Sequence, residues 1–339
     1  MLRTLTLLSA AILLSSCEQL FLKPEPGTAP SAIFDEAWTF VDREYAFFKY
    51  KGIDWNEVRS RYEPLISDGM SEEDLFDVLA SMLYELRDGH VNLSSDFDIS
   101  RNWTWYLNSP QNFNFTVLER GYFQEKEQYA GPFILYDFGD VGYMRYASFA
   151  STVTPADLDY VLEKFADRKG LIIDIRDNDG GSLANVNLIA SRFTETEVTI
   201  GSWSFKSGPG HEDFTPLEDI VLEPAEGLLG VEPKRFTKPV VVLMNRSSYS
   251  AANFFPLYMK ALPQVTLMGD TSGGGGGAPA NTQLANGWVL RCSSSRLFDP
   301  QGFNVENGIP PDVRVDLDPA DEAAFRDTML ELALFTLRR

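Results

Sequence analysis

The stretch that decides the fold is VVVLMNRSSYSAANFF, residues 240–255. Its first five residues are a continuous apolar run, which is typical of a strand buried on both faces of an α/β sheet. The next residues are polar, and a helical pattern begins at about Ala251. Ser250 is therefore predicted at the corner between a buried strand and a helix. Free N–H groups and the positive end of the helix dipole lie at such a corner.

This position gives Ser250 two interpretations. As a nucleophile it would project from a rigid turn, beside N–H groups that stabilise an oxyanion. As an N-cap it would only satisfy the first turn of the helix. The segment alone leaves both open.

A second apolar strand, LIIDIR at residues 171–176, runs into the turn DNDGGS. Gly180 and Gly181 permit positive φ and leave backbone N–H groups pointing into open space. Such a turn completes an oxyanion hole when its strand neighbours the strand that leads to Ser250. A simple glycine turn is the alternative.

A serine nucleophile needs a general base, usually His or Lys. The chain has two histidines, His90 and His211. His211 lies in a polar loop and is expected at the surface, whereas His90 follows Asp88-Gly89 at the end of the helical region. Lys260 is ten residues beyond Ser250 on the same predicted helix, roughly 15 Å away at about 1.5 Å per residue. His90 is thus the candidate base, although a single histidine is more often structural.

The chain divides into segments by pattern. Apolar side chains at helical spacing predict a small helical domain over residues 31–90, and residues 91–135 form an irregular, partly β connecting segment. Residues 136–339 alternate strand and helix patterns, with a polar insertion at 203–236 and one closing helix at 320–337. The sequence therefore predicts an α/β core preceded by a small helical domain.

The first residues are expected to be a targeting segment. Residues 1–16 have a positive start and an apolar run of about ten residues, as in a signal peptide. The run ends in Leu-Ser-Ser-Cys, which resembles the bacterial lipobox, so Cys17 is the expected lipidation site. Residues 17–30 carry three prolines and are predicted to be a tether. This resemblance implies a lipid-anchored protein of the bacterial cell envelope, on the periplasmic or outer-membrane face.

Composition excludes several classes of function. There are 29 Lys and Arg against 49 Asp and Glu, a net charge of 29 − 49 = −20, which argues against nucleic acid as a partner. Two cysteines and two histidines give no disulfide framework and no recognisable zinc site. The five glycines at 273–277 lack the Gly-Lys-Ser/Thr of a phosphate loop. No metal or other cofactor is expected.

Four segments in order resemble the C-terminal processing peptidase superfamily: ELRDGHVNL, LIIDIRDNDGGS, VVVLMNRSSYSAANFF with GDTSGGGGG, and VENGIPPDV. The resemblance covers about residues 60–330. It implies a helical N-terminal part and a crotonase-like (ClpP-like) α/β core with a serine nucleophile. The stretch TSGGGGGAP lacks the lysine of the tail-specific peptidases, so the chain looks more like the branch of the tricorn core and the retinoid-binding protein.

The resemblance assigns roles residue by residue. Ser250 matches the nucleophile, His90 the base and Glu306 a supporting carboxylate. The oxyanion hole would use Gly180 or Gly181 with the N–H of Ala251, and a substrate backbone could approach Gly273 and Gly274. Three features depart from the pattern: Gly89 replaces a serine, Asn253 replaces an acidic residue, and residues 91–135 are too few for a PDZ domain.

The sequence therefore predicts a membrane-anchored serine endopeptidase acting on peptides or proteins. The alternative is a catalytically inactive lipoprotein of the same fold that binds a peptide or an apolar ligand. Fold alone does not separate the two.

Overall fold

The computed structural model describes residues 27–102, 108–227 and 230–339. The predicted signal peptide, Cys17 and most of the tether lie outside these residues. In the part described, no helix is long and apolar enough to cross a membrane.

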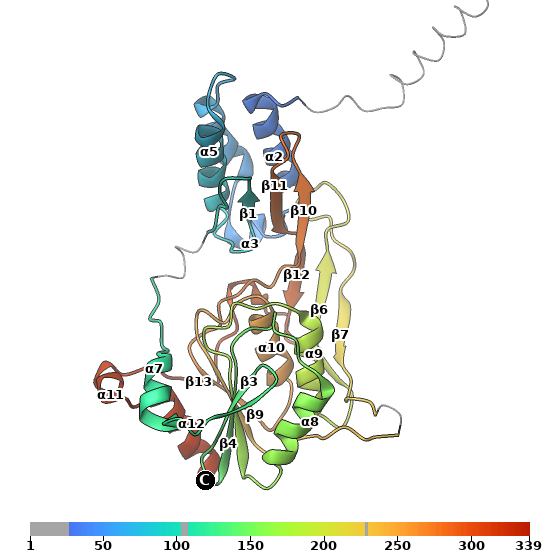
Figure 1. The fold of residues 1–339 in the computed structure, drawn as a ribbon. Coiled ribbons are helices and arrows are strands. Elements are labelled where there is room, and N and C mark those ends of the chain that lie inside the picture. Colours follow the sequence, from blue (N-terminus) through green and yellow to red (C-terminus); the bar gives the residue numbers. More distant parts are fainter. Residues whose placement is uncertain (1–26, 103–107, 228–229) are drawn as a thin grey trace, which may run out of the picture.

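The helical region forms the upper part of the molecule in Figure 1. Its elements are α2 (Pro30–Glu44), α3 (Phe48–Lys51), α4 (Trp55–Tyr62), η1 (Glu63–Leu65) and α5 (Glu72–Tyr84). Ser71 caps the start of α5, because its Oγ accepts from the N–H of Asp74 at 3.1 Å. The apolar faces of these helices pack into one hydrophobic cluster.

The core is a seven-stranded sheet of order β13-β9-β8-β5-β4-β3-β2. Strands β4 (Val141–Tyr146), β5 (Gly170–Asp174), β8 (Val240–Met244), β9 (Val265–Gly269) and β13 (Val313–Arg314) are parallel. An antiparallel edge is added by β3 (Phe133–Asp137) and β2 (Gln128–Ala130). The predicted mixed α/β architecture is confirmed.

The central strands are apolar throughout because both faces of the sheet are covered. Val240, Val242 and Met244 of β8 face one hydrophobic cluster, and Val241 and Leu243 face another. Helices α8 (Pro155–Lys164), α9 (Leu183–Ala190) with η3 (Ser191–Phe193), and α10 (Ala251–Lys260) belong to the first side. Helix α12 (Thr328–Arg338) covers the second side, and α7 (Phe115–Leu118), η2 (Glu119–Phe123) and α11 (Pro319–Ala323) lie nearby.

Two segments differ from the sequence-based expectation. The polar insertion contributes strand structure to a three-stranded sheet, in which β6 (Val198–Phe205) pairs with β7 (Glu218–Leu222) and with β12 (Ser295–Phe298). The predicted closing helix is two helices, separated at residues 324–327, where Phe325 has φ +53°.

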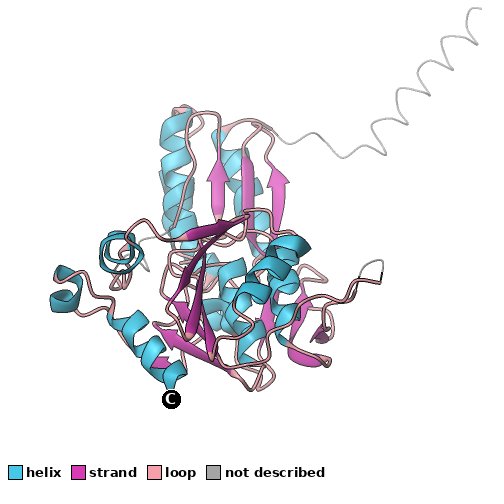
Figure 2. Cartoon of the chain, turned by 60° about the horizontal axis from the view of Figure 1, so that its bottom comes forward, coloured by secondary structure: helices cyan, strands magenta, loops and turns pink. Residues whose placement is uncertain are grey.

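The hairpin of β10 (Pro279–Gln283) and β11 (Val289–Ser293) leaves the core and pairs with β1 (Asn92–Ser94). Figure 2 shows these three strands upright against the helices. Leu290 and Cys292 are buried in the same cluster as α2 and α5. The helical part is thus completed by a hairpin from late in the sequence. The sequence pattern instead places this hairpin in the α/β core, with residues 136–339.

Candidate active site

Ser250 lies where the sequence places it, between β8 and α10, and its backbone is unusual. Its φ is +57° and its ψ is −120°, a conformation that is rare for a residue with a side chain and stores on the order of 1–3 kcal/mol of strain. The N–H of Ser250 donates to the carbonyl of Gly274 at 2.9 Å. Its side chain makes no capping hydrogen bond to the helix. The N-cap interpretation is therefore wrong for this serine.

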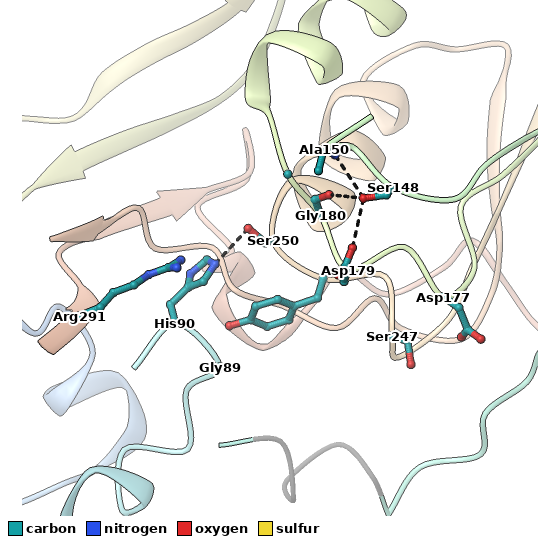
Figure 3. A pocket seen from close by; sticks show the side chains of 12 residues that line it. Gly89, His90, Ser148, Ala150, Asp177, Asp179, Gly180, Ser247, Ser250 and Arg291 are labelled. Atoms are coloured by element: carbon teal, nitrogen blue, oxygen red, sulfur yellow. Dashed lines mark hydrogen bonds between the residues drawn. The ribbon is translucent and has the colours of Figure 1, made fainter. Parts of the chain in front are cut away.

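The Ser250 hydroxyl faces His90 instead, with 3.0 Å between Oγ and Nε2 (Figure 3). Both residues line a cleft of about 520 Å³. His90 follows α5 in a turn fixed by Asp88, whose Oδ1 accepts from the His90 N–H at 2.8 Å. Two segments 160 positions apart thus meet at one hydrogen bond.

The other ring nitrogen of His90 determines its tautomer. Nδ1 lies 2.9 Å from the carbonyl oxygen of Gly277, which can only accept a hydrogen bond. Nδ1 therefore carries the proton, and Nε2 is left as the acceptor for the Ser250 hydroxyl. Burial lowers the pKa of His90 to about 4, and Asp88 opposes this shift. The imidazole is neutral at pH 7.

The side chain of Tyr249 explains Gly89, the position at which the resembled family has a serine. The Tyr249 ring packs edge-on against His90, with centroids 5.1 Å apart. A Cβ atom at Gly89 would lie 2.8 Å from the Tyr249 hydroxyl oxygen, too close for any larger residue without movement.

The glycine turn after β5 lies against Ser250, as expected for neighbouring parallel strands whose carboxyl ends share one edge. A Cβ at Gly180 would meet the Ser250 Cβ at 2.8 Å. The Gly180 N–H, however, donates to Asn178 Oδ1 at 3.0 Å, so Gly180 is not a free donor. No described acceptor takes the N–H of Gly181 or Ala251, and these two remain the candidates for an oxyanion hole.

Gly273 and Gly274 pack against the backbone of the segment that holds Ser250. They are buried and do not line the described cleft. A Cβ at Gly273 would lie 2.5 Å from the carbonyl oxygen of Arg246, and one at Gly274 would lie 2.1 Å from that of Glu306. These glycines allow the close backbone packing that holds Ser250, and the approach of a substrate backbone to them stays a prediction.

Glu306, in η4 (Val305–Asn307), is buried, and among the described residues its carboxylate is hydrogen-bonded to neither Ser250 nor His90. Its Oε1 lies 2.8 Å from Lys51 Nζ, and its Oε2 accepts from the Gly276 N–H at 3.0 Å. Lys51 also lies 3.7 Å from the Asp88 carboxylate. Glu306 therefore supports the two segments on either side of His90, and the ring itself is held by a carbonyl.

Three ionisable groups form a buried cluster, which we call the Lys51 cluster: Lys51, Asp88 and Glu306. Burial, reinforced by Asp88, raises the pKa of Glu306 to about 8 against the opposing charge of Lys51. Burial acts to raise the pKa of Asp88, but the charge of Lys51 and the hydrogen bond from the His90 N–H lower it overall. Lys51 was missed by sequence reasoning, because nothing in FKYK marks a buried ammonium.

His211 lies away from this site. Its Nε2 is 2.8 Å from Asp42 Oδ1, and its ring packs on Phe48 with centroids 4.5 Å apart. It is partly exposed and does not line the Ser250 cleft.

A serine hydroxyl bonded to a neutral imidazole, at the carboxyl edge of a parallel sheet and beside two N–H donors, is the arrangement of serine hydrolases. The family model for peptidase family S41 matches residues 140–315, and the model for the tricorn protease C1 domain matches residues 26–84. The chain belongs to peptidase family S41.

Similar proteins agree with this family. A candidate peptidase from Parabacteroides merdae, solved as a crystal structure, is 40% identical with a TM-score of 0.86, over 92% of this chain and 97% of that one. The carboxy-terminal-processing protease of Bartonella bacilliformis is 24% identical over 185 residues, and the tricorn protease of Thermoplasma volcanium is 30% identical over 178. Each alignment covers 52% of this chain but only 39% and 15% of those proteins.

Proposed function

We propose that this peptidase uses Ser250 as its nucleophile and His90 as its general base. The observation that carries the proposal is the 3.0 Å contact between Ser250 Oγ and His90 Nε2, in a tautomer fixed by Gly277. The site supports endopeptidase action on peptide or protein substrates, in a core that we take to be crotonase-like.

The reaction follows from this geometry. Nε2 takes the hydroxyl proton as Oγ attacks the scissile carbonyl carbon, and the N–H groups of Gly181 and Ala251 receive the oxyanion. The imidazolium then gives its proton to the leaving amine, and the peptide C–N bond breaks. A water molecule, deprotonated by the same imidazole, releases the acyl group from Ser250 and restores the enzyme.

The test is labelling with a fluorophosphonate, which forms a covalent bond to an activated serine. The purified protein should be labelled at Ser250, and peptide mapping identifies the residue. A folded protein that resists labelling at neutral pH would instead be the inactive ligand-binding lipoprotein.

The pH dependence of kcat/KM tests the state of His90. The base works unprotonated, so the rate should rise through an apparent pKa near 4 and be flat above it, rather than rise near the ordinary 6.5. An onset above about 9 would identify a lysine base. The free energy of unfolding should change in the same direction as the rate. Between pH 6.5 and 4 the unfolded chain binds a proton at His90 more tightly than the folded chain does, so stability falls as the pH falls.

We expect Lys51→Met to lower the free energy of unfolding by about 3–5 kcal/mol, the usual loss when one partner of a buried pair is removed. Without the Lys51 ammonium, the carboxyl groups of Asp88 and Glu306 should both have raised pKa values in the folded state. Their protonated forms are tolerated at low pH, so the loss should be larger at pH 8 than at pH 5.

Urea unfolding at the two pH values measures this loss. Lys169→Met is the matched control, because its ion pair with Asp140 is 3.8 Å long and exposed, where such pairs are worth about 0–1 kcal/mol. Equal losses in the two variants would contradict a buried charge cluster.

We also propose that the chain is a lipoprotein of the bacterial cell envelope, anchored through Cys17. The basis is the Leu-Ser-Ser-Cys sequence after an apolar run, with a proline-bearing segment behind it. Cys17→Ser should abolish lipidation and move the protein from the membrane fraction to the soluble fraction. Mass spectrometry that finds an unmodified Cys17 in membrane-extracted protein would refute the anchor.

A further inference from the structure

The cleft that holds Ser250 continues past His90. A second cleft of about 420 Å³ shares Gly89, Asp179 and Arg291 with it. In Figure 3, the His90 ring lies between Arg291 and Ser250, and Gly180 lies on the other side of the serine. The groove therefore has a His90 end, where Arg291 lies, and a glycine end.

The strand pattern of β11 directs Arg291 into this groove. Its neighbours Leu290 and Cys292 are buried against the helices, and side chains alternate along a strand, so Arg291 faces the opposite way. Asn92 on β1 and Asn281 on β10 pair directly with Arg291. Three polar side chains thus form one row across the sheet, with the arginine in the middle.

The guanidinium of Arg291 has an unmet hydrogen bond. Its Nε is buried, and no atom of the described residues accepts from it. No ion pair within the described ranges includes Arg291 either. A buried donor without an acceptor is unfavourable, and a carboxylate is the acceptor whose geometry fits the guanidinium fork.

Charge along the groove has a direction. Arg101 and Arg291 both line the second cleft, in a chain whose net charge is −20. Asp179 and Arg291 line both clefts, but Asp177 lines only the Ser250 cleft and repels an anion there, whereas Arg101 lines only the second cleft. A bound carboxylate is therefore favoured at the His90 end.

Resting on the proposed function, the geometry also fixes which part of a substrate lies at that end. The carbonyl oxygen points to Gly181 and Ala251, and the leaving amine must reach His90 Nε2 to receive its proton. We propose that Arg291, with Arg101 and Asn281, forms a subsite for a carboxylate on the leaving side of the scissile bond. That carboxylate belongs either to an acidic side chain or to a free carboxyl terminus.

Matched peptide pairs test this subsite. A library of internally quenched octapeptides first identifies a neutral sequence that the enzyme cleaves. This peptide is then resynthesised with an amidated C-terminus in matched pairs. The members of a pair differ at one of the first two positions after the scissile bond, where one has Asn and the other Asp, or one has Gln and the other Glu. A second set ends two residues after the cleaved bond, as free acid or as amide. The ratio of kcat/KM is measured within each pair.

The wild-type enzyme should favour the carboxylate member of at least one set by about 10- to 100-fold, as expected for a charged hydrogen bond. The set that shows the preference identifies the source of the carboxylate. Arg291→Met should bring that ratio close to one. Arg296→Met is the matched control. Arg296 lies on β12, forms an ion pair with Glu212 and does not line the second cleft, so this variant should keep the wild-type ratio.

Ratios near one for both sets, or a preference that survives Arg291→Met, would overturn the subsite. Fluorophosphonate labelling separates this failure from failure of the proposed function, because the probe has no leaving peptide. A protein that is labelled at Ser250 but shows no preference keeps its catalytic pair and loses the subsite. An unlabelled, inactive protein loses both.

Discussion

Ser250→Ala should abolish turnover while leaving the fold intact. Loss of the serine of such a catalytic unit lowers kcat on the order of 10⁶-fold, since no other hydroxyl of the described residues bonds His90 Nε2. The alanine removes only the oxygen, and the Ser250 side chain makes no capping bond that would be lost. Single-turnover assays and fluorophosphonate labelling measure the effect, and circular dichroism checks the fold.

Ser182→Ala is the matched control for this variant. Ser182 precedes α9 after a glycine turn, as Ser250 precedes α10, and it makes no side-chain capping bond either. It should be labelled like the wild type. Residual turnover of Ser250→Ala above a few per cent, in a cleanly folded sample, would show that another residue is the nucleophile.

His90→Ala should be almost as damaging as loss of the serine. Without the imidazole, no group takes the proton of the Ser250 hydroxyl. The substitution should therefore lower kcat by about 10⁶-fold, as removal of the serine does. The labelling rate should fall in parallel, because the fluorophosphonate also needs a deprotonated serine.

His211→Ala is the comparison for His90→Ala. It removes a partly exposed ion pair with Asp42 and should leave kcat nearly unchanged. If the His211 variant loses activity and the His90 variant keeps it, the assignment of the base is wrong.

Some features of the fold could be predicted because burial requires a recognisable apolar pattern within a short segment. The apolar run Val240–Met244 specifies its strand locally, and the structure has the strand at those residues. The closing helix was predicted as one element because its apolar pattern is almost continuous. The break at Phe325 depends on a backbone conformation that the pattern does not reveal.

The candidate site could be predicted only where its function depends on a side chain that is rare in this sequence or stands at a distinctive position. Scarcity of histidine indicated His90, and the corner position indicated Ser250. The acceptor for the other nitrogen of His90 is a backbone carbonyl, that of Gly277, and no sequence pattern marks a carbonyl. The buried role of Lys51 depends on three segments, α3, the turn at Leu86 and Arg87, and η4, which meet only in the folded chain.

The hairpin β10–β11 has a consequence for the timing of activity. His90 is translated early, but the carbonyl that orients it is at Gly277, and the strands that complete its sheet end at Ser293. A chain growing from its amino terminus therefore carries a histidine without its support until more than four-fifths of its length exists. On the proposed mechanism, the pair of Ser250 and His90 is therefore complete only after the hairpin has been synthesised.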